Sequence, residues 1–146
     1  DSSYNERYNQ LKKAENDMRV EYLGSVKVEN FSENKFSDPV VFKRAKHVIT
    51  ENKRVLDAKK YLLENNIEKF GQLMNESHSS YSKDFEASTE DVDIITQRSI
   101  DAGALGSRLT GGGFGGFTVS LIEKNQYESW YDTMKKYYSE DKFFEV

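Results

Sequence analysis

A run of glycines late in the chain is the segment whose residue types are hardest to explain by packing. Five of the six residues from Gly111 to Gly116 are glycine, and Phe114 interrupts them. Glycine loses more conformational entropy on folding than any other residue, so such a run destabilises a chain unless the backbone needs positive φ or a very close approach to something. We expect a ligand or a neighbouring loop against this segment. A hairpin turn without a ligand is the alternative.

The spacing of these glycines fits none of the better-known phosphate-binding turns. Gly111, Gly113 and Gly116 satisfy the pattern G-x-G-x-x-G, but a dinucleotide-binding turn needs a helix directly after it, and here a strand is expected. The P-loop pattern fails because no lysine follows the glycines. A protein-kinase glycine loop is excluded because only residues 117–146 remain for a whole catalytic core.

Few other residues could carry chemistry. The absence of cysteine excludes disulfides, thiolate zinc sites and cysteine nucleophiles. The two histidines, His47 and His78, are too few for a histidine-rich metal site, and we interpret both as structural. A net charge of −4 gives no basic footprint for nucleic acid. Three aspartates are interpreted as helix caps or surface acids: Asp84, Asp91 and Asp101.

Helices must hold these residues in the first two thirds of the chain. Apolar residues recur there at steps of three and four, the period of an amphipathic helix. This spacing predicts helices over residues 39–63, 67–81 and 88–100, and helix-forming residues predict one over 4–19. Ser88 followed by Asp91 resembles a capping box at the start of the third of these segments. Residues 21–36 give no clear prediction.

The chain around and after the glycines predicts a sheet. Residues 117–122 are β-branched and aromatic, which indicates a strand, paired in a hairpin that begins near Gly103. A helix over 126–138 and a final strand over 142–146 follow from the same patterns. We therefore predict an α+β fold in which helices cover one face of an antiparallel sheet. If the glycines led directly into a helix instead, a dinucleotide-binding fold would be indicated.

Composition limits the class of protein. A chain of 146 residues that is 36% hydrophobic and 32% charged is typical of one soluble domain. No apolar run approaches the roughly 20 residues needed to span a bilayer. The first residues lack an apolar stretch behind a basic start, so we expect neither a secretory signal nor an anchor. These features predict a cytoplasmic protein without a membrane partner.

The segment from Gly106 to Gly116, GSRLTGGGFGG, resembles the third signature motif of the superfamily of galactokinase, homoserine kinase, mevalonate kinase and phosphomevalonate kinase (GHMP kinases). Phe114 between the glycine clusters favours the galactokinase form. Two helical segments also resemble galactokinases. They are RAKHV at 44–48 with Glu51, and the stretch from Phe70 through His78 to Asp84.

This resemblance implies that residues 1–146 are the ferredoxin-like C-terminal domain of a GHMP kinase, with the N-terminal catalytic half absent. It implies transfer of the γ-phosphoryl group of ATP, with Mg²⁺, to the anomeric hydroxyl of galactose, a reaction governed by positioning and charge stabilisation. In such kinases the catalytic aspartate and the main phosphate loop belong to the missing half. We therefore assign no catalytic residue and no metal ligand here, and expect this chain alone to be inactive.

The resemblance also implies which residues meet the substrates. Tyr4, in the stretch SYNER at 3–7, lies where a galactokinase tyrosine hydroxyl meets the sugar, although Tyr8 replaces a usual arginine. Ser107 and Arg108 could reach a phosphate or a carboxylate, a structural ion pair being the alternative. The loop expected in the cleft, against the nucleotide loop and sugar of the missing half, comprises Gly111, Gly112, Gly113, Phe114, Gly115 and Gly116.

Two other functions remain open at this point. A galactokinase-like sensor would bind galactose and ATP without turnover, and would differ from the enzyme chiefly in the missing half. An N-acetylgalactosamine kinase would need only a roomier pocket around the second carbon of the sugar. In each case galactose or a related sugar, ATP and the missing domain are the expected partners.

Overall fold

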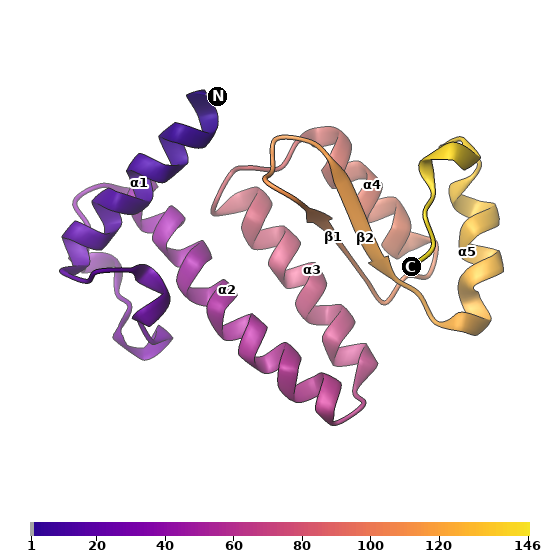
Figure 1. Ribbon diagram of the computed structural model, residues 1–146, viewed down its shortest axis with the longest axis horizontal. Helices are drawn as coiled ribbons and strands as arrows, with labels where there is room; N and C mark the ends of the chain where they lie inside the picture. Colours follow the sequence, from indigo (N-terminus) through magenta and orange to yellow (C-terminus); the bar gives the residue numbers. More distant parts are fainter. Residues whose placement is uncertain (1) are drawn as a thin grey trace.

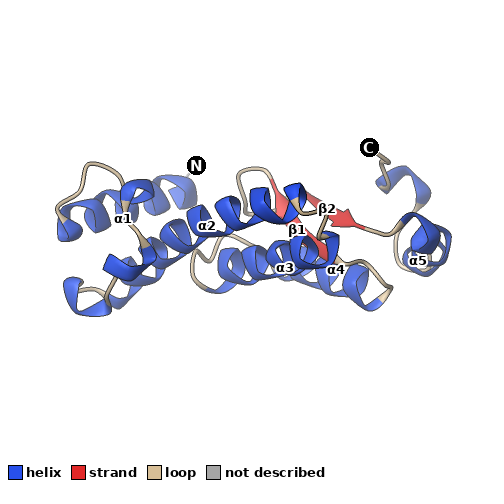
Figure 2. Ribbon diagram, turned by 90° about the horizontal axis from the view of Figure 1, so that it is seen from below, coloured by secondary structure: helices blue, strands red, loops and turns tan. Residues whose placement is uncertain are grey.

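A two-stranded hairpin packs against α3 and α4 in the computed structural model, which describes residues 2–146 (Figure 1). Figure 2 shows an elongated molecule with α1 and α5 at opposite ends and the hairpin between them. The main elements are α1 (Ser2–Met18), α2 (Pro39–Leu63), α3 (Ile67–Lys83), α4 (Glu90–Asp101), β1 (Gly106–Thr110), β2 (Phe117–Leu121) and α5 (Tyr127–Met134). Short 3₁₀ helices are η1 (Leu23–Ser25), η2 (Val28–Asn30), η3 (Glu33–Lys35), η4 (Lys124–Gln126) and η5 (Glu140–Lys142).

Capping residues set the helix boundaries. Asp38 accepts a hydrogen bond from the Val40 amide at the start of α2, and Pro39 occupies the first turn. Asn66 caps α3 in the same way, after Asn65 breaks the preceding helix with a φ of 53°. All three predicted amphipathic helices and the N-terminal helix are therefore present.

The predicted capping box of α4 is wrong by one residue. Thr89, not Ser88, caps the helix, and its hydroxyl accepts from the Val92 amide at 3.3 Å. The Ser88 hydroxyl instead donates to the Asp93 carboxylate at 2.6 Å, so it ties the segment before α4 to the helix surface. Only Ser88 has an acidic residue three positions later, yet the tertiary path of the chain selects Thr89 as the cap.

The first core lies where α1 crosses the N-terminal half of α2. Residues 21–36, for which the sequence predicted no element, form η1, η2 and η3 over this crossing. Phe31 and Phe42 stack with ring centres 5.0 Å apart, and Phe36 meets both edge-on. The buried apolar residues of this core are Ala14, Leu23, Val26, Val41, Ala45 and Ile49.

The hairpin agrees with the sequence prediction. β1 and β2 pair antiparallel, from Gly106 opposite Leu121 to Thr110 opposite Phe117, and the glycine run joins them. A strand and not a helix follows the glycines, so the alternative dinucleotide-binding fold is excluded. The predicted α+β arrangement, an antiparallel sheet covered by helices, is confirmed.

Helix α3 lies against the outer edge of β1. The Asn75 side chain accepts from the Ser107 amide at 2.9 Å and donates to the Leu105 carbonyl at 3.2 Å, and His78 Nδ1 accepts from the Leu109 amide at 3.3 Å. Gly71 and Gly106 let the two backbones touch, because a Cβ at Gly106 would lie 2.8 Å from the Gly71 Cα. Two residues without side chains are required for this approach.

A row of hydroxyls joins the hairpin to α4 and α5. The Ser107 and Ser120 hydroxyls lie 2.8 Å apart, Ser120 and Ser99 also 2.8 Å apart, and the Trp130 indole donates to Ser99 at 3.0 Å. Every member has a partner, so the buried hydroxyls carry no desolvation penalty without compensation. Ala104, Trp130 and Met134 form the second, smaller core beside them.

The predicted final strand is wrong. Within residues 2–146 the sheet has only two strands, and the segment after η5 lacks regular structure. The Phe143 ring meets Trp130 and Tyr131 edge-on at 5.9 and 5.1 Å, whereas Phe144 turns to Phe117 at 6.3 Å. These aromatic residues pack on α5 and β2 and do not pair in a strand ladder. Helix α5 also ends at Met134, four residues before the predicted end.

Candidate functional site

The loop at residues 111–116 joins β1 to β2 in a conformation that requires glycine. The φ angles are 99° at Gly111, 87° at Gly113, 123° at Gly115 and 105° at Gly116. Residues with a Cβ rarely adopt such angles. Phe114 also has a positive φ, 60°, although it carries a Cβ. Contacts with neighbouring residues must therefore hold the loop in this shape.

One side of this loop rests on the bend at residues 84–87, which joins α3 to α4. The Phe114 amide donates to the Ala87 carbonyl at 2.7 Å. A Cβ at Gly113 would lie 2.6 Å from the Tyr81 hydroxyl and 2.8 Å from the Ala87 carbonyl oxygen, so no side chain fits there. The packed side of the loop is therefore a close backbone approach to the protein itself.

The other side of the loop is open. A Cβ at Gly111, Gly112 or Gly115 would meet nothing within 4 Å. Positive φ accounts for glycine at two of these positions, but Gly112 has neither a positive φ nor a neighbour. The open side presents bare backbone, which is the surface that a ligand or a further domain could approach closely.

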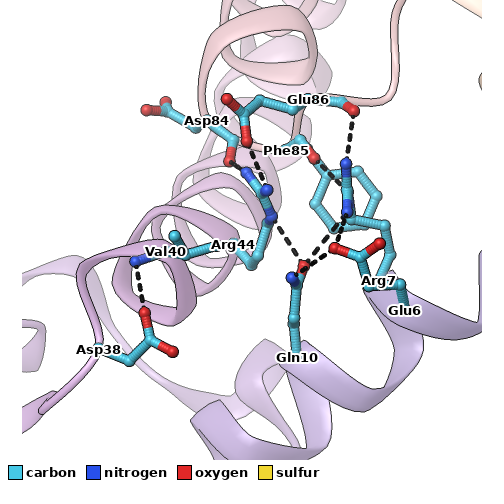
Figure 3. A network of polar contacts seen from close by, with 9 residues as sticks. All are labelled: Glu6, Arg7, Gln10, Asp38, Val40, Arg44, Asp84, Phe85 and Glu86. Atoms are coloured by element: carbon cyan, nitrogen blue, oxygen red, sulfur yellow. Dashed lines mark hydrogen bonds and ion pairs between the residues drawn. The ribbon is translucent and has the colours of Figure 1, made fainter. Parts of the chain in front are cut away.

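Two arginines hold the bend that supports the loop (Figure 3). Arg7 of α1 donates from Nε to the Phe85 carbonyl at 2.7 Å and from Nη2 to the Glu86 carbonyl at 2.8 Å. Arg44 of α2 donates to the Asp84 carbonyl at 2.7 Å and forms an ion pair with the Glu86 carboxylate. Together with the bond at Ala87, four consecutive carbonyls of the bend are each given a donor.

Tyr4 lies on α1, the helix whose Arg7 contacts the glycine loop. It precedes Arg7 by three positions on α1, so the two side chains share one face of the helix. The Arg7 guanidinium lies 5.7 Å from the centre of the Phe114 ring. Tyr4 is 61% exposed. Figure 1 shows the start of α1 and the β1–β2 loop along the same edge.

Ser107 and Arg108 lie away from the open side of the loop. Ser107 is fully buried and its hydroxyl is bonded to Ser120, within the row of hydroxyls described above. The Arg108 guanidinium lies 3.2 Å from the Glu51 carboxylate of α2, which is the structural ion pair considered as the alternative. Among the described residues, neither side chain has a hydrogen bond or ion pair to Tyr4 or to the glycine loop, so both serve the packing of the hairpin.

His47 supports the bend from below. Its Nδ1 lies 3.1 Å from the Ser80 hydroxyl, and its ring packs on Tyr81 and Phe85 at 5.2 and 4.9 Å. Burial lowers the pKa of His47 to about 4, so the ring is neutral at pH 7. The histidine therefore acts as a packed, uncharged side chain between α2 and the end of α3.

His78 joins α3 to both β1 and α4. While Nδ1 accepts from β1, Nε2 lies 3.0 Å from the Asp93 carboxylate without the alignment of a hydrogen bond. Burial lowers the pKa of His78, against the opposing effect of Asp93.

The three aspartates interpreted as caps or surface acids all lie at helix ends. Asp84 follows α3, Asp91 lies in the first turn of α4 and Asp101 ends it.

The bend and its two arginines were missed by the sequence analysis. Arg44 carried a usable signal in the sequence, because it falls within the apolar stripe of α2 beside Val41 and Ala45. In the structure it is only 3% exposed. A cation at such a position must have buried partners. Arg7 carried no such signal, since its partners at 85 and 86 are carbonyls almost eighty residues away.

In the part of the chain that the structure describes, no group of three or more His, Asp or Glu side chains could hold a metal ion. No helix among these residues is long and apolar enough to cross a membrane.

Comparison with solved structures supports this architecture. The galactokinase of Lactococcus lactis, solved in complex with galactose, superposes with a TM-score of 0.87 at 31% identity, over 93% of this chain and 37% of that one. The mevalonate kinase of L. major, solved with R-mevalonate, gives a TM-score of 0.61 at 27% identity, over 91% and 36%.

Curated relatives are named galactokinase. Those of Clostridium acetobutylicum and Enterococcus faecalis are 37% and 35% identical over 147 residues, which is 96% of this chain and 38% of each relative. That of Mycobacterium tuberculosis is 42% identical over 100 residues, 68% of this chain and 28% of the relative. The chain thus spans less than two fifths of the length of these relatives. Residues 58–140, more than half of the chain, match the family described as "GHMP kinases C terminal". This chain therefore belongs to the family of GHMP kinase C-terminal domains.

Proposed function

We propose that residues 1–146 are the C-terminal domain of a galactokinase, which transfers the γ-phosphoryl group of ATP to the anomeric hydroxyl of galactose. The observation that supports this most is the glycine loop, one side packed on Ala87 and the other side bare backbone. The relatives named galactokinase, and the matching structure solved with galactose, support the sugar as substrate.

In this proposal the chain contributes binding surfaces. The open side of the loop at 111–116 lies against the nucleotide loop and the sugar in the rest of the longer protein, where a side chain would intrude. The Tyr4 hydroxyl bonds the sugar. As the family resemblance implies, Mg²⁺ and ATP are held mainly by the rest of the protein, which also supplies the catalytic residues. The cytoplasmic location stays a prediction.

Turnover and binding by the full-length protein test this proposal. Purified protein should convert galactose and Mg-ATP to galactose 1-phosphate and ADP, followed by a coupled ADP assay and by phosphorus NMR of the product. Galactose binding in calorimetry without turnover would identify the sensor. Faster turnover of N-acetylgalactosamine than of galactose would identify the other kinase. Absence of both binding and turnover with either sugar would overturn the proposal.

A further inference from the structure

Arg7 makes a contact that its side-chain chemistry fits closely. Two nitrogens of one guanidinium donate to the carbonyls of two consecutive residues, Phe85 and Glu86, at 2.7 and 2.8 Å. The side chain as a whole is only 12% exposed. A planar fork can satisfy two acceptors in a fixed geometry, whereas a lysine ammonium is a single point charge. The contact therefore depends on arginine and not on charge alone.

The bend needs this support because its backbone is unfavourable. Glu86 has a φ of 52°, in the left-handed region that residues with a Cβ rarely adopt. Arg44 of α2 contacts the same bend at Asp84 and Glu86. The Gln10 side chain accepts from Arg44 at 2.9 Å and from Arg7 at 3.4 Å (Figure 3). The bend is thus held between α1 and α2, and Ala87, which receives the loop amide, is the next residue.

Arg7 differs from Arg44 in its contact with the loop itself. Its guanidinium lies 5.7 Å from the Phe114 ring centre, within the range of a cation–π contact. It is also one helical turn from Tyr4. Arg7 therefore contacts the support of the loop and the loop, from the same helix face that carries the residue assigned to the sugar.

We propose that Arg7 is a positioning residue, which fixes the glycine loop relative to Tyr4 by locking the bend at 84–87 and contacting Phe114. It acts through these residues and not by touching a substrate. The kinetic part of this inference rests on the proposed function, whereas the effect on loop order does not. Removing the fork should free the loop while the rest of the fold stays intact.

Arg98 provides a matched control. It donates to the Tyr138 hydroxyl at 3.0 Å and lies 4.2 Å from the Tyr137 ring centre, so it combines a hydrogen bond and a cation–π contact as Arg7 does. These partners follow α5, at the far end of the molecule from α1. Arg98→Lys should therefore reproduce any general loss of stability without affecting the loop.

Hydrogen exchange of the full-length protein tests the positioning without requiring activity. In Arg7→Lys the peptide that contains the Phe114 amide should exchange at least ~10-fold faster, with peptides from the centre of α3 unchanged. Arg98→Lys should leave the Phe114 peptide unchanged. An unchanged Phe114 peptide in Arg7→Lys, or a rise across all peptides in both variants, would overturn the inference. If Arg7→Lys does not fold, Phe114→Leu removes the ring contact and should give a smaller rise in the same peptide. No rise there would also overturn it.

Kinetics complete the test and separate it from the proposed function. Arg7→Lys should lower galactose kcat by ~10- to 100-fold, the effect expected of a small misplacement, while Arg98→Lys stays within about twofold of the parent. Because Arg7 and Phe114 share a contact, the double variant should lose less than the product of the two single losses. Independent losses, or equal losses in Arg7→Lys and Arg98→Lys, would overturn the positioning role. A parent protein without kinase activity would instead remove the proposed function, and the exchange result would still decide on Arg7.

Discussion

Tyr4 is the residue on which the sugar assignment can be tested alone. In the full-length protein, Tyr4→Phe removes one neutral hydrogen bond, which contributes about 0.5–1.5 kcal/mol. The galactose KM should rise about 2- to 12-fold and the ATP KM should stay unchanged in steady-state kinetics.

Tyr8→Phe is the control for this change. Tyr8 lies one turn further along α1, is similarly exposed, and contacts Lys12. The substitution should alter neither constant. Equal effects of Tyr4→Phe on both substrates, or none on either, would give Tyr4 a packing role.

The buried histidine under the bend predicts a dependence of stability on pH. Burial holds the pKa of His47 at about 4; Glu51 and Asp84 oppose this lowering, and Arg54 and Arg108 add to it. In the unfolded chain the pKa is about 6.5. Below that pH the unfolded state binds a proton that the folded state excludes. The stabilisation that neutral His47 gives the folded state is therefore fully present above pH 6.5, and it is lost as the pH falls from 6.5 to about 4.

Urea unfolding of this chain at pH 7 and pH 5 measures that contribution. His47 should account for about 2 kcal/mol of the loss in unfolding free energy between the two values. His47→Gln should be less stable at pH 7, but should lose correspondingly less on acidification. The variant also controls for His78, whose pKa is lowered too and which remains in both proteins. Equal losses in parent and variant would contradict the buried, neutral state of His47.

The glycine loop is the element whose two sides predict different outcomes. Gly113→Ala places a Cβ against Tyr81 and Ala87 at a φ of 87°, so the loop must leave its support. We expect a loss of about 1–3 kcal/mol in stability and a loss of ~10²-fold in turnover by the full-length protein. Thermal unfolding and kcat for galactose measure the two effects.

Gly112→Ala is the matched change on the open side. It meets nothing within 4 Å and needs no unusual φ, so the Tm should stay unchanged. A loss of turnover without a loss of Tm would then report on whatever approaches the open side. If Gly113→Ala keeps both parental stability and activity, the loop is only a turn.

Elements with local signals could be predicted from the sequence. The spacing of apolar residues is enough to predict α2, α3 and α4, and the glycine run is enough to predict the turn between two short strands. The final strand could not be assigned correctly, because Phe143 and Phe144 suit either a ladder or aromatic packing and only the position of α5 decides between them. The site divides in the same way. The loop was visible in the sequence, but its support at 84–87 depends on contacts from α1 that no local pattern encodes.

Residues 1–146 alone should not phosphorylate galactose. The proposal assigns the base, the metal ligands and the main phosphate loop to the rest of the longer protein. A coupled assay with galactose and Mg-ATP at high protein concentration should give the rate of buffer alone, with the full-length protein as positive control. Any rate that scales with the concentration of this chain would show that catalytic residues lie within it.

The packing of α3 on β1 leaves only one edge of the two-stranded sheet open to a further strand. Asn75 and His78 already occupy hydrogen-bonding positions on the outer edge of β1, where a neighbouring backbone would otherwise pair. The sheet is thus terminated by helix side chains at one margin and can act as a template only at the other, beside Phe117–Leu121. Any strand recruited from elsewhere, whether by the longer protein or by a second molecule during misassembly, must join on the β2 side.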